Sequence, residues 1–174
     1  VIRLHTRVPV VDPGRISEDL IQALRTDRAL YVAVHSNHAR EFTASARAAC
    51  ARLTRAGIPL LGQTVLLRGV NDHEQALERL MRVQVEQRIK PYYLHHGDLA
   101  RGTSHFRVAI SRGQQLLSHL RGRLSGLCQP TYVIDLPGGA GKVPIGPSYV
   151  EARHESHWTL RDLHGRLHEI PDLA

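Results

Sequence analysis

Cysteine is scarce in this chain. Only Cys50 and Cys128 occur among its 174 residues, and they lie far apart in the sequence. They cannot form a Cys-x-x-Cys pair, so the sequence excludes a disulfide framework and a cysteine-rich metal site within this chain. Long apolar runs are lacking as well. No stretch of about 18 apolar residues is present, which excludes a spanning helix and gives no reason to expect a membrane partner.

Lysine and aromatic residues are also few. Aromatic residues make up 5% of the chain, and 21 of its 23 basic residues are arginine because only Lys90 and Lys142 are lysines. The formal charge is +7, but the arginines are scattered along the sequence. A nucleic-acid-binding surface needs them gathered into a stripe with interleaved aromatics, so we expect no nucleic acid partner. The composition, 42% hydrophobic and 22% charged, indicates one folded domain of ordinary size.

The chain begins at Val1, without an initiator methionine, in a strand-like segment. No charged region followed by an apolar stretch is found there, so no secretory signal is visible. We expect this first strand to lie in the core of the fold. A start inside a core strand suggests that the N-terminal part of a larger protein is missing.

Short β-rich runs alternate with helical stretches. Strands are predicted at residues 2–4, 30–34, 60–66, 90–94 and 131–134, and helices at residues 17–24, 43–56, 72–87 and 111–123. Each helix has a side chain at its start that can satisfy free N–H groups, namely Ser17, Thr43, Asp72 or Ser111. This alternation predicts an α/β fold with a parallel sheet. About five strands are too few to close an eight-stranded barrel, so residues 1–147 are predicted to form the later part of a larger barrel.

The pattern changes after Pro147. Residues 158–163 and 166–170 are strand-like, and His164 and Gly165 between them favour a turn. We therefore predict a C-terminal β-hairpin extension or tail over residues 148–174, acting as a packing element rather than as a separate domain.

Polar side chains recur where the predicted strands end. Ligands of parallel α/β folds bind beyond the carboxyl ends of the strands, so this position predicts the mouth of a functional site. The residues concerned are His5, His35, Ser36, Asn37, His38, His95, His96, Asp98 and Asp135, with Gln63 inside the third strand.

Histidines at this position raise the possibility of a metal site. The pair His35 and His38 and the pair His95 and His96, with Asp98, offer imidazole and carboxylate ligands. Twelve histidines in 174 residues also produce close pairs by chance. We therefore assign no metal ligands to this chain.

The most informative segment is residues 135–144, DLPGGAGKVP. Glycines let backbone N–H groups turn toward a phosphate or a cofactor ring, and Lys142 ends the predicted loop. An amine that condenses with an aldehyde must be lysine, because the arginine guanidinium stays protonated. The alternatives are a surface turn with an incidental lysine, or a nucleotide-binding loop. A Walker A loop fits poorly because Val143 follows Lys142.

At these residues the chain resembles the C-terminal half of the lysine 2,3-aminomutase family, whose members are pyridoxal-phosphate-dependent radical S-adenosylmethionine enzymes. The resemblance covers roughly residues 1–150 in family order. It rests on RVPVV at residues 7–11, QTVLLRGVND at 63–72, PYY at 91–93, GDL at 97–99, SHFR at 104–107 and the 135–144 segment. It implies a radical-SAM partial (β/α) barrel.

The resemblance also implies roles for individual residues. Lys142 would carry pyridoxal 5′-phosphate as a Schiff base, within the loop of Gly138, Gly139 and Gly141. Asp98 and Asp135 would hold the distant ammonium group of the substrate, which suits paired carboxylates in a partly desolvated pocket. His35 and Gln63 would line the S-adenosylmethionine site. The alternative for Asp98 and Asp135 is a helix-cap or turn role.

In the family, a 4Fe–4S cluster cleaves S-adenosylmethionine to a 5′-deoxyadenosyl radical, and the substrate amine migrates from C2 to C3. The Cys-x-x-x-Cys-x-x-Cys motif that holds the cluster is absent here, and we expect it upstream of this chain. The fragment alone should not catalyse. A cysteine-rich zinc segment found at the C-terminus of some members is also absent.

The resemblance favours free L-lysine as the substrate and β-lysine as the product, because both Asp98 and Asp135 are present. The alternatives are a related aminomutase acting on glutamate or on a protein lysine, and a non-catalytic scaffold remnant that binds phosphate or nucleotide. It also implies a cytoplasmic setting and a homo-oligomer at full length.

Overall fold

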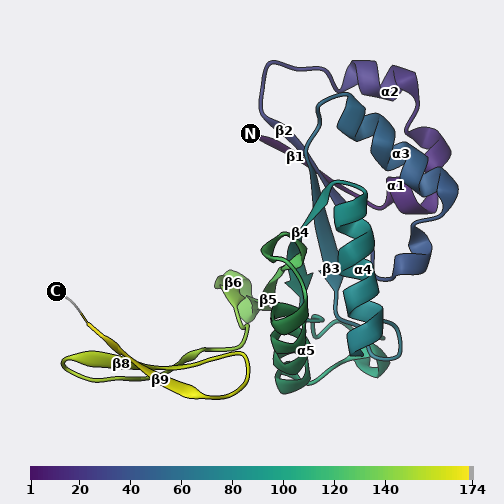
Figure 1. Ribbon diagram of the computed structural model, residues 1–174. Coiled ribbons are helices and arrows are strands. Elements are labelled where there is room, and N and C mark those ends of the chain that lie inside the picture. Colours follow the sequence, from purple (N-terminus) through teal and green to yellow (C-terminus); the bar gives the residue numbers. More distant parts are fainter. Residues whose placement is uncertain (173–174) are drawn as a thin grey trace.

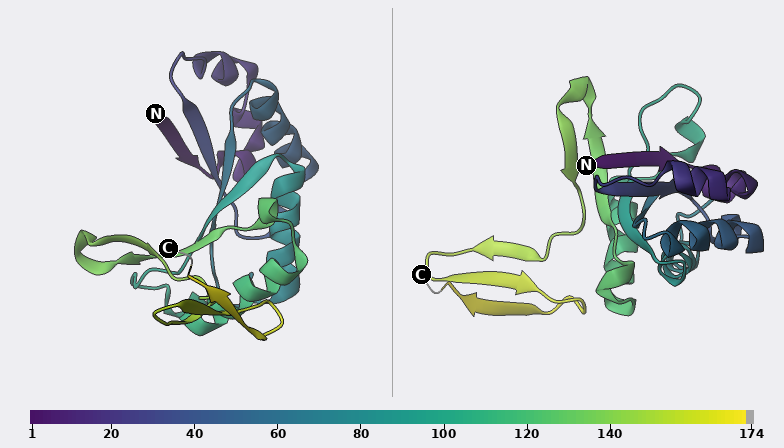
Figure 2. Two further views of the ribbon diagram at one scale, coloured as in Figure 1. Left: turned by 60° about the vertical axis from the view of Figure 1, so that its left-hand side comes forward. Right: turned by 90° about the horizontal axis from the view of Figure 1, so that it is seen from above.

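The computed structural model describes residues 1–172 and contains two sheets. The larger is a curved, six-stranded sheet that resembles half of a barrel (Figures 1 and 2). Its strands lie side by side in chain order, the first five parallel and β6 antiparallel to β5. They are β1 (Ile2–Thr6), β2 (Leu30–His35), β3 (Leu60–Val65), β4 (Ile89–His95), β5 (Thr131–Leu136) and β6 (Gly141–Pro144). The predicted α/β partial barrel is confirmed.

The helices cover the convex face of this sheet (Figure 2). They are α1 (Val8–Val11), α2 (Glu18–Ala23), α3 (Ala44–Arg55), α4 (Glu74–Glu86) and α5 (Ile110–Arg123), with short 3-10 turns at Pro13–Arg15, Ala39–Glu41, Ser104–Phe106, Gly126–Cys128 and Pro137–Gly139. The four long predicted helices are thus present.

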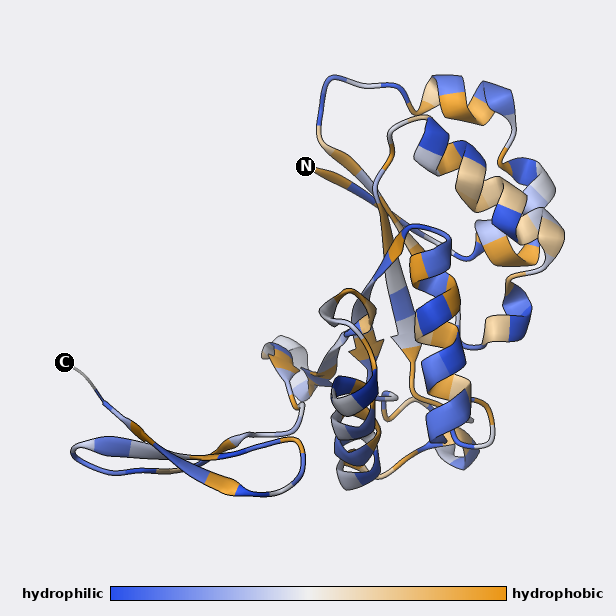
Figure 3. Ribbon diagram, viewed as in Figure 1, coloured by the Kyte–Doolittle hydropathy of each residue, from blue (hydrophilic) through white to orange (hydrophobic). Residues whose placement is uncertain are grey.

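The core lies between the sheet and these helices. Directly paired residues of a sheet share a face, and alternate residues along a strand point to opposite faces. Val32, Val34, Leu60 and Leu94 point outward from the strands and are buried against leucines of α3, α4 and α5. The apolar stripes of α3 and α4 in Figure 3 face the same layer. The other face of each strand is left free to carry polar side chains.

Two of the four predicted helix starts are correct. Ser17 and Thr43 accept hydrogen bonds from the backbone of Leu20 and Ala46, as N-caps do. The start of α4 is one residue later than predicted, because the ring of His73 rather than Asp72 accepts from the first turn. Helix α5 begins at Ile110, and Ser111 lies inside its first turn.

Within the described residues the first strand, β1, lies at the edge of the sheet, and Ile2 and Leu4 are each 37% exposed. Only one neighbour, β2, pairs with this strand in the described residues.

The strand β6 was missed by the sequence prediction. Its four residues include Gly141 and Pro144, two residue types that are rare in strands. The strand turns residues 135–144 into a hairpin instead of an open loop. Lys142 therefore lies on a strand directly opposite Asp135, and not at the end of a loop.

A second, three-stranded antiparallel sheet follows and stands away from the half-barrel (Figure 2). It consists of β7 (Val150–Arg153), β8 (His157–Arg161) and β9 (Leu167–Pro171). The predicted hairpin is β8–β9, and β7 is an additional strand on its edge. The division of the chain at residue 147 into two parts stays a prediction. Within residues 1–172, no helix has the length and apolar character required to cross a membrane.

Candidate active site

Each strand of the half-barrel contributes one polar side chain to its concave face, near the carboxyl ends of the parallel strands. His35 is paired with Gln63, and Asp135 with Lys142, so the members of each pair share a face. The six residues, in strand order, are His5, His35, Gln63, His95, Asp135 and Lys142. Four of them, His35, Gln63, Asp135 and Lys142, are site residues predicted from the sequence.

Lys142 and Asp135 form the most strongly charged contact of this face. The lysine Nζ lies 2.5 Å from each carboxylate oxygen, and 29% of its side chain is exposed. The hydrogen bond from Lys142 lowers the pKa of Asp135 below its ordinary value. The pair shows that this carboxylate can receive an ammonium group on the concave face.

His95 lies beside this pair. Its Nδ1 is 3.4 Å from Lys142 Nζ and 3.7 Å from Asp135 Oδ2, and its side chain is only 18% exposed. Burial, and then the neighbouring lysine ammonium, lower the pKa of His95 below its ordinary value. The ring is therefore neutral at neutral pH and has one N–H group.

Gln63 links His95 to the first strand. One atom of its amide lies 3.1 Å from His95 Nε2 and the other lies 2.7 Å from His5 Nδ1. Gln63 is buried, so its amide has little access to water. A line of contacts thus runs across the concave face from Asp135 to His5.

His35 carries a buried polar atom without a hydrogen-bond partner. Its Nε2 is buried and has no hydrogen-bond partner within the described residues. Burial lowers the pKa of His35 below its ordinary value. A buried ring nitrogen without a partner costs free energy, which a polar ligand group could offset. His35 and Gln63, side by side, therefore fit a polar ligand at the ends of β2 and β3.

Two asparagines hold these strand ends in place. Asn71 is fully buried, donates to the backbone oxygens of Asn37 and Val65, and accepts from Leu67 N. Asn37 accepts from Val65 N. Asn71 in the 63–72 segment thus has a structural role: it fixes the backbone that presents His35 and Gln63.

Aromatic rings border the site on β4. The Tyr93 ring lies 5.8 Å from Lys142 Nζ and packs edge-on against His95, with ring centroids 5.7 Å apart. Its hydroxyl accepts a hydrogen bond from Tyr92. A ring face near an ammonium group stabilises it modestly and keeps water away from one side.

The structure does not bring Asp98 into contact with Asp135. Asp98 is exposed, three residues beyond the end of β4, and borders a separate hollow with Leu67, Phe106 and Arg107. No hydrogen bond or ion pair joins it to Lys142 or Asp135 within residues 1–172. Since β4 and β5 are neighbours, both aspartates still lie at the same edge of the sheet.

The histidine pairs considered as metal ligands diverge. His38 caps the turn at Ala39–Glu41, and His96 points the other way, with Nδ1 2.6 Å from the Tyr132 hydroxyl. Among residues 1–172, no group of three or more histidine, cysteine, aspartate and glutamate side chains is arranged to hold a metal ion.

The two cysteines do not fit an iron–sulfur cluster either. Cys50 and Cys128 are both buried in the core on the convex side, and burial raises the pKa of the Cys50 thiol to about 11. We derive no step through a cluster from these residues.

The glycine turn fits the predicted loop in its backbone. Gly138, Gly139 and Gly141 have φ angles of 70°, 74° and 108°, which favour glycine, and a Cβ at each would meet only open space. The turn is exposed and leads directly to Lys142, which lies near the carboxyl ends of the parallel strands, whereas Lys90 lies at the start of β4. The chain thus offers an amine that can hold an aldehyde cofactor covalently, with open backbone beside it.

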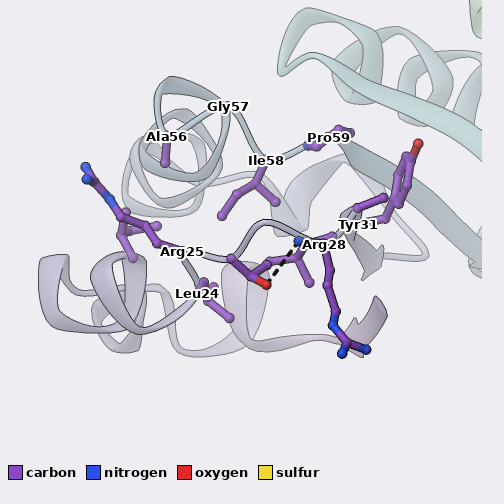
Figure 4. Close-up of a pocket in the computed structure, with 12 residues that line it drawn as sticks. Leu24, Arg25, Arg28, Tyr31, Ala56, Gly57, Ile58 and Pro59 are labelled. Carbon is purple, nitrogen blue, oxygen red and sulfur yellow. Dashed lines mark hydrogen bonds between the residues drawn. The ribbon is translucent and has the colours of Figure 1, made fainter. Parts of the chain in front are cut away.

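A hollow at the opposite ends of the strands carries none of these residues (Figure 4). It lies where β2 and β3 begin and is lined by Leu24, Arg25, Arg28, Tyr31 and Pro59, among others. Its polar side chains are two arginines, Tyr31 and Thr26, whose hydroxyl accepts from Arg28 N. The candidate site is therefore the concave face, and not this hollow.

The sequence prediction identified His95 and His5 only as possible mouth residues and missed Tyr93. Period-two alternation along β4 places Tyr93 and His95 on one face, and that signal was present in the sequence. The shift in register between β3 and β4 next to Gln63 could not be predicted from the sequence.

A solved structure shares this fold. A radical SAM methyltransferase from Sphaerobacter thermophilus superimposes on 76% of this chain with a TM-score of 0.54 at 19% identity, over 40% of its own length. The half-barrel therefore shares its fold with that methyltransferase.

Sequence comparisons define the family. The family profile described as Lysine-2,3-aminomutase matches residues 117–172. The chain is 42% identical to the L-lysine 2,3-aminomutase of Acetoanaerobium sticklandii over 99% of its length, and 42% identical to that of Fusobacterium nucleatum over 95%. A glutamate 2,3-aminomutase from Clostridioides difficile is 34% identical over 98%. This chain belongs to the lysine 2,3-aminomutase family.

The matches cover only part of each relative. The aligned regions are 42%, 39% and 40% of the lengths of these three proteins, so the chain spans about two fifths of the relatives it matches.

Proposed function

We propose that this chain is part of an L-lysine 2,3-aminomutase, which interconverts L-lysine and β-lysine. The observation that carries the proposal is the Lys142–Asp135 pair on the concave face of a half-barrel that shares its fold with a radical SAM methyltransferase. The reaction is an isomerisation: the amino group moves from C2 to C3, a hydrogen moves from C3 to C2, and nothing is oxidised or reduced overall.

In this proposal Lys142 holds pyridoxal 5′-phosphate covalently, with the turn of Gly138, Gly139 and Gly141 beside it. His35 and Gln63 hold S-adenosylmethionine, and the unpartnered His35 Nε2 is the atom left for it. The bound groups supply the radical and the electron sink; the ligands of a 4Fe–4S cluster are expected outside this chain. The task of the residues described is to place these groups against the substrate and to exclude water.

Asp135, together with Asp98, is proposed to receive the side-chain ammonium of the substrate. The contact between the Lys142 ammonium and Asp135 supports this, because both carboxylate oxygens lie within hydrogen-bond distance of an ammonium nitrogen. A glutamate substrate would bring its own carboxylate toward Asp135, and like charges repel. This favours L-lysine over L-glutamate, although both activities occur among the relatives.

The test uses the full-length enzyme with its cofactors. L-Lysine should yield β-lysine, and L-glutamate should give no product. Asp135→Ala should lower lysine turnover by at least about 100-fold, the cost of leaving a charge without its partner, while covalent loading of Lys142 stays near wild type. Equal loss of loading and turnover would remove Asp135 from substrate binding. Turnover of glutamate instead of lysine would replace the proposed substrate.

A further inference from the structure

His95 has contacts on both sides that cannot all be made at once. Its Nδ1 faces Lys142 Nζ, and its Nε2 faces the Gln63 amide, with Gln63 Nε2 on the side of His95 and Oε1 on the side of His5. An ammonium and an amide NH₂ are both donors. A neutral imidazole accepts at one nitrogen only, so this arrangement has one donor too many.

Two arrangements of the same residues resolve the conflict. In the first, Lys142 is an ammonium that donates to Asp135 and to His95 Nδ1. The proton of the ring is then on Nε2 and needs an acceptor, so the Gln63 amide must turn its oxygen to His95 and its NH₂ to His5. N and O of an amide have nearly the same shape, so this turn leaves the packing unchanged.

In the second arrangement the Lys142 nitrogen no longer donates to His95. The ring proton then moves to Nδ1, on the side of Asp135 Oδ2. These two atoms are 3.7 Å apart, so Asp135 must move closer to accept a hydrogen bond once Lys142 no longer holds it. His95 Nε2 becomes the acceptor for the Gln63 NH₂, and Gln63 Oε1 accepts from His5. The structure shows this amide orientation together with the Lys142–His95 contact of the first arrangement, which is the conflict described above.

We propose that His95 is a positioning residue through which the chemical state of the Lys142 nitrogen sets the orientation of the Gln63 amide. The contacts Asp135–Lys142–His95–Gln63–His5 form one hydrogen-bond chain with a direction, and the lysine nitrogen reverses it. The burial of Gln63 supports the switch, because water cannot replace a missing partner there.

The consequence rests on the proposed function. If Lys142 carries the aldehyde cofactor and Gln63 contacts S-adenosylmethionine, covalent loading at the lysine presents the Gln63 amide in the other orientation. The two sites are then coupled through His95, and each changes the affinity of the other by the same factor.

The direct test is the protonated nitrogen of His95, measured by ¹⁵N NMR of histidine-labelled full-length protein and assigned with His95→Gln. We expect Nε2–H when Lys142 is a free ammonium. In Lys142→Met, which has no donor, we expect Nδ1–H. This comparison needs no cofactor, so it can fail while the proposed function stands. The same tautomer in both proteins would overturn the switch.

A binding experiment tests the coupling. The dissociation constant of S-adenosylmethionine should differ by about fivefold or more between enzyme with free and with loaded Lys142. His95→Phe should bring the two constants within about twofold of each other. In His95→Asn, only the nitrogen position that faces Lys142 is kept, and in His95→Gln only the one that faces Gln63, so both should lose the coupling too.

His96→Gln is the matched control, because His96 contacts Tyr132 on the other side of the sheet. This variant should keep the wild-type difference between the two dissociation constants of S-adenosylmethionine. A difference that persists in His95→Phe, or none in the wild type, would contradict the coupling. Failure of Lys142 to load at all would instead overturn the proposed function, and the coupling with it.

Discussion

Lys142 Nζ lies at the same distance, 2.5 Å, from both carboxylate oxygens of Asp135, its direct partner across the β5–β6 hairpin. The carboxylate that is proposed to receive the substrate ammonium is therefore occupied by the chain's own ammonium. The same nitrogen cannot hold an aldehyde cofactor and remain an ammonium on Asp135. Covalent loading of Lys142 should free this carboxylate.

Substrate binding should therefore depend on loading. We expect L-lysine to bind the loaded full-length enzyme at least about tenfold more tightly than the unloaded one, since a hydrogen bond to a charged group is worth about 1.5–3 kcal/mol. Lys142→Met, which leaves Asp135 unoccupied, should bind L-lysine without loading. Calorimetry measures the affinity for L-lysine of the loaded enzyme, the unloaded enzyme and Lys142→Met. Equal affinity of loaded and unloaded wild-type enzyme would show that Asp135 is not the seat of the substrate.

Asp98 gives a second prediction, because it is exposed and has no contact with the Lys142–Asp135 pair within the described residues. If it shares the substrate ammonium, Asp98→Asn should raise KM for L-lysine by about tenfold and leave covalent loading of Lys142 unchanged. Steady-state kinetics and the visible absorbance of the cofactor check the two parts. An unchanged KM would leave Asp135 as the single carboxylate at this end of the substrate.

Stability should fall with acidification through the range of histidine titration. Burial lowers the pKa of His35, His95 and His96 in the folded chain. Below about pH 6.5 the unfolded chain binds protons at these rings that the folded chain resists, so the free energy of unfolding decreases. The loss begins as pH falls through the unfolded value and ends below the lowered folded values.

Thermal unfolding between about pH 7.5 and 5.5 measures this, since 1 kcal/mol shifts Tm by about 2–4 °C in a domain of this size. His95→Asn should unfold with a smaller decrease in Tm over that range. His164→Gln, at an exposed turn of the second sheet, should show the wild-type decrease. An equal decrease in His95→Asn and wild type would contradict the burial argument for this ring.

The packing of α5 on the sheet gives a stability prediction with an internal control. A Cβ at Gly113 would overlap the hydroxyl and ring of Tyr132, whereas a Cβ at Gly122 on the same helix meets nothing. Gly113→Ala should destabilise the protein by about 1–3 kcal/mol. Gly122→Ala should stabilise it by up to about 1 kcal/mol, because alanine favours helix. Denaturant unfolding of both variants measures the two changes in the free energy of unfolding. Changes of the same sign would contradict this packing.

The sequence predicts helices and strands correctly where the hydrophobic periodicity is clear and the residues that begin or end an element are distinctive. The five parallel strands and four long helices follow from alternating apolar runs, with Ser17 and Thr43 as caps. Short elements were missed: β6 and β7 have four residues each, and Gly141 and Pro144 in β6 argue against a strand. Four residues that were predicted as site residues, Lys142, Asp135, Gln63 and His35, lie on one face of the sheet. Which of them are in contact depends on the register of the paired strands, which the sequence does not show.

The role of His95 shows most clearly what the sequence does not predict. In the sequence it is one of twelve histidines and one of a pair. Its contact with Lys142 exists because β6 folds back beside β5, and its contact with Gln63 exists because β3 and β4 are paired with a shift in register. Both are long-range features that local propensity does not encode.

The most direct test of the account is borohydride reduction of the full-length enzyme purified with pyridoxal 5′-phosphate, followed by peptide mapping. The reduced pyridoxyl group should be found on Lys142 and not on Lys90, whose ammonium donates to the backbone oxygens of Gly126, Leu127 and Gln129 near the amino-terminal ends of β4 and β5. Lys142→Arg should carry no label, because a guanidinium does not condense with the aldehyde. A label on another lysine, with Lys142 unmodified, would contradict the assignment of the concave face as the active site.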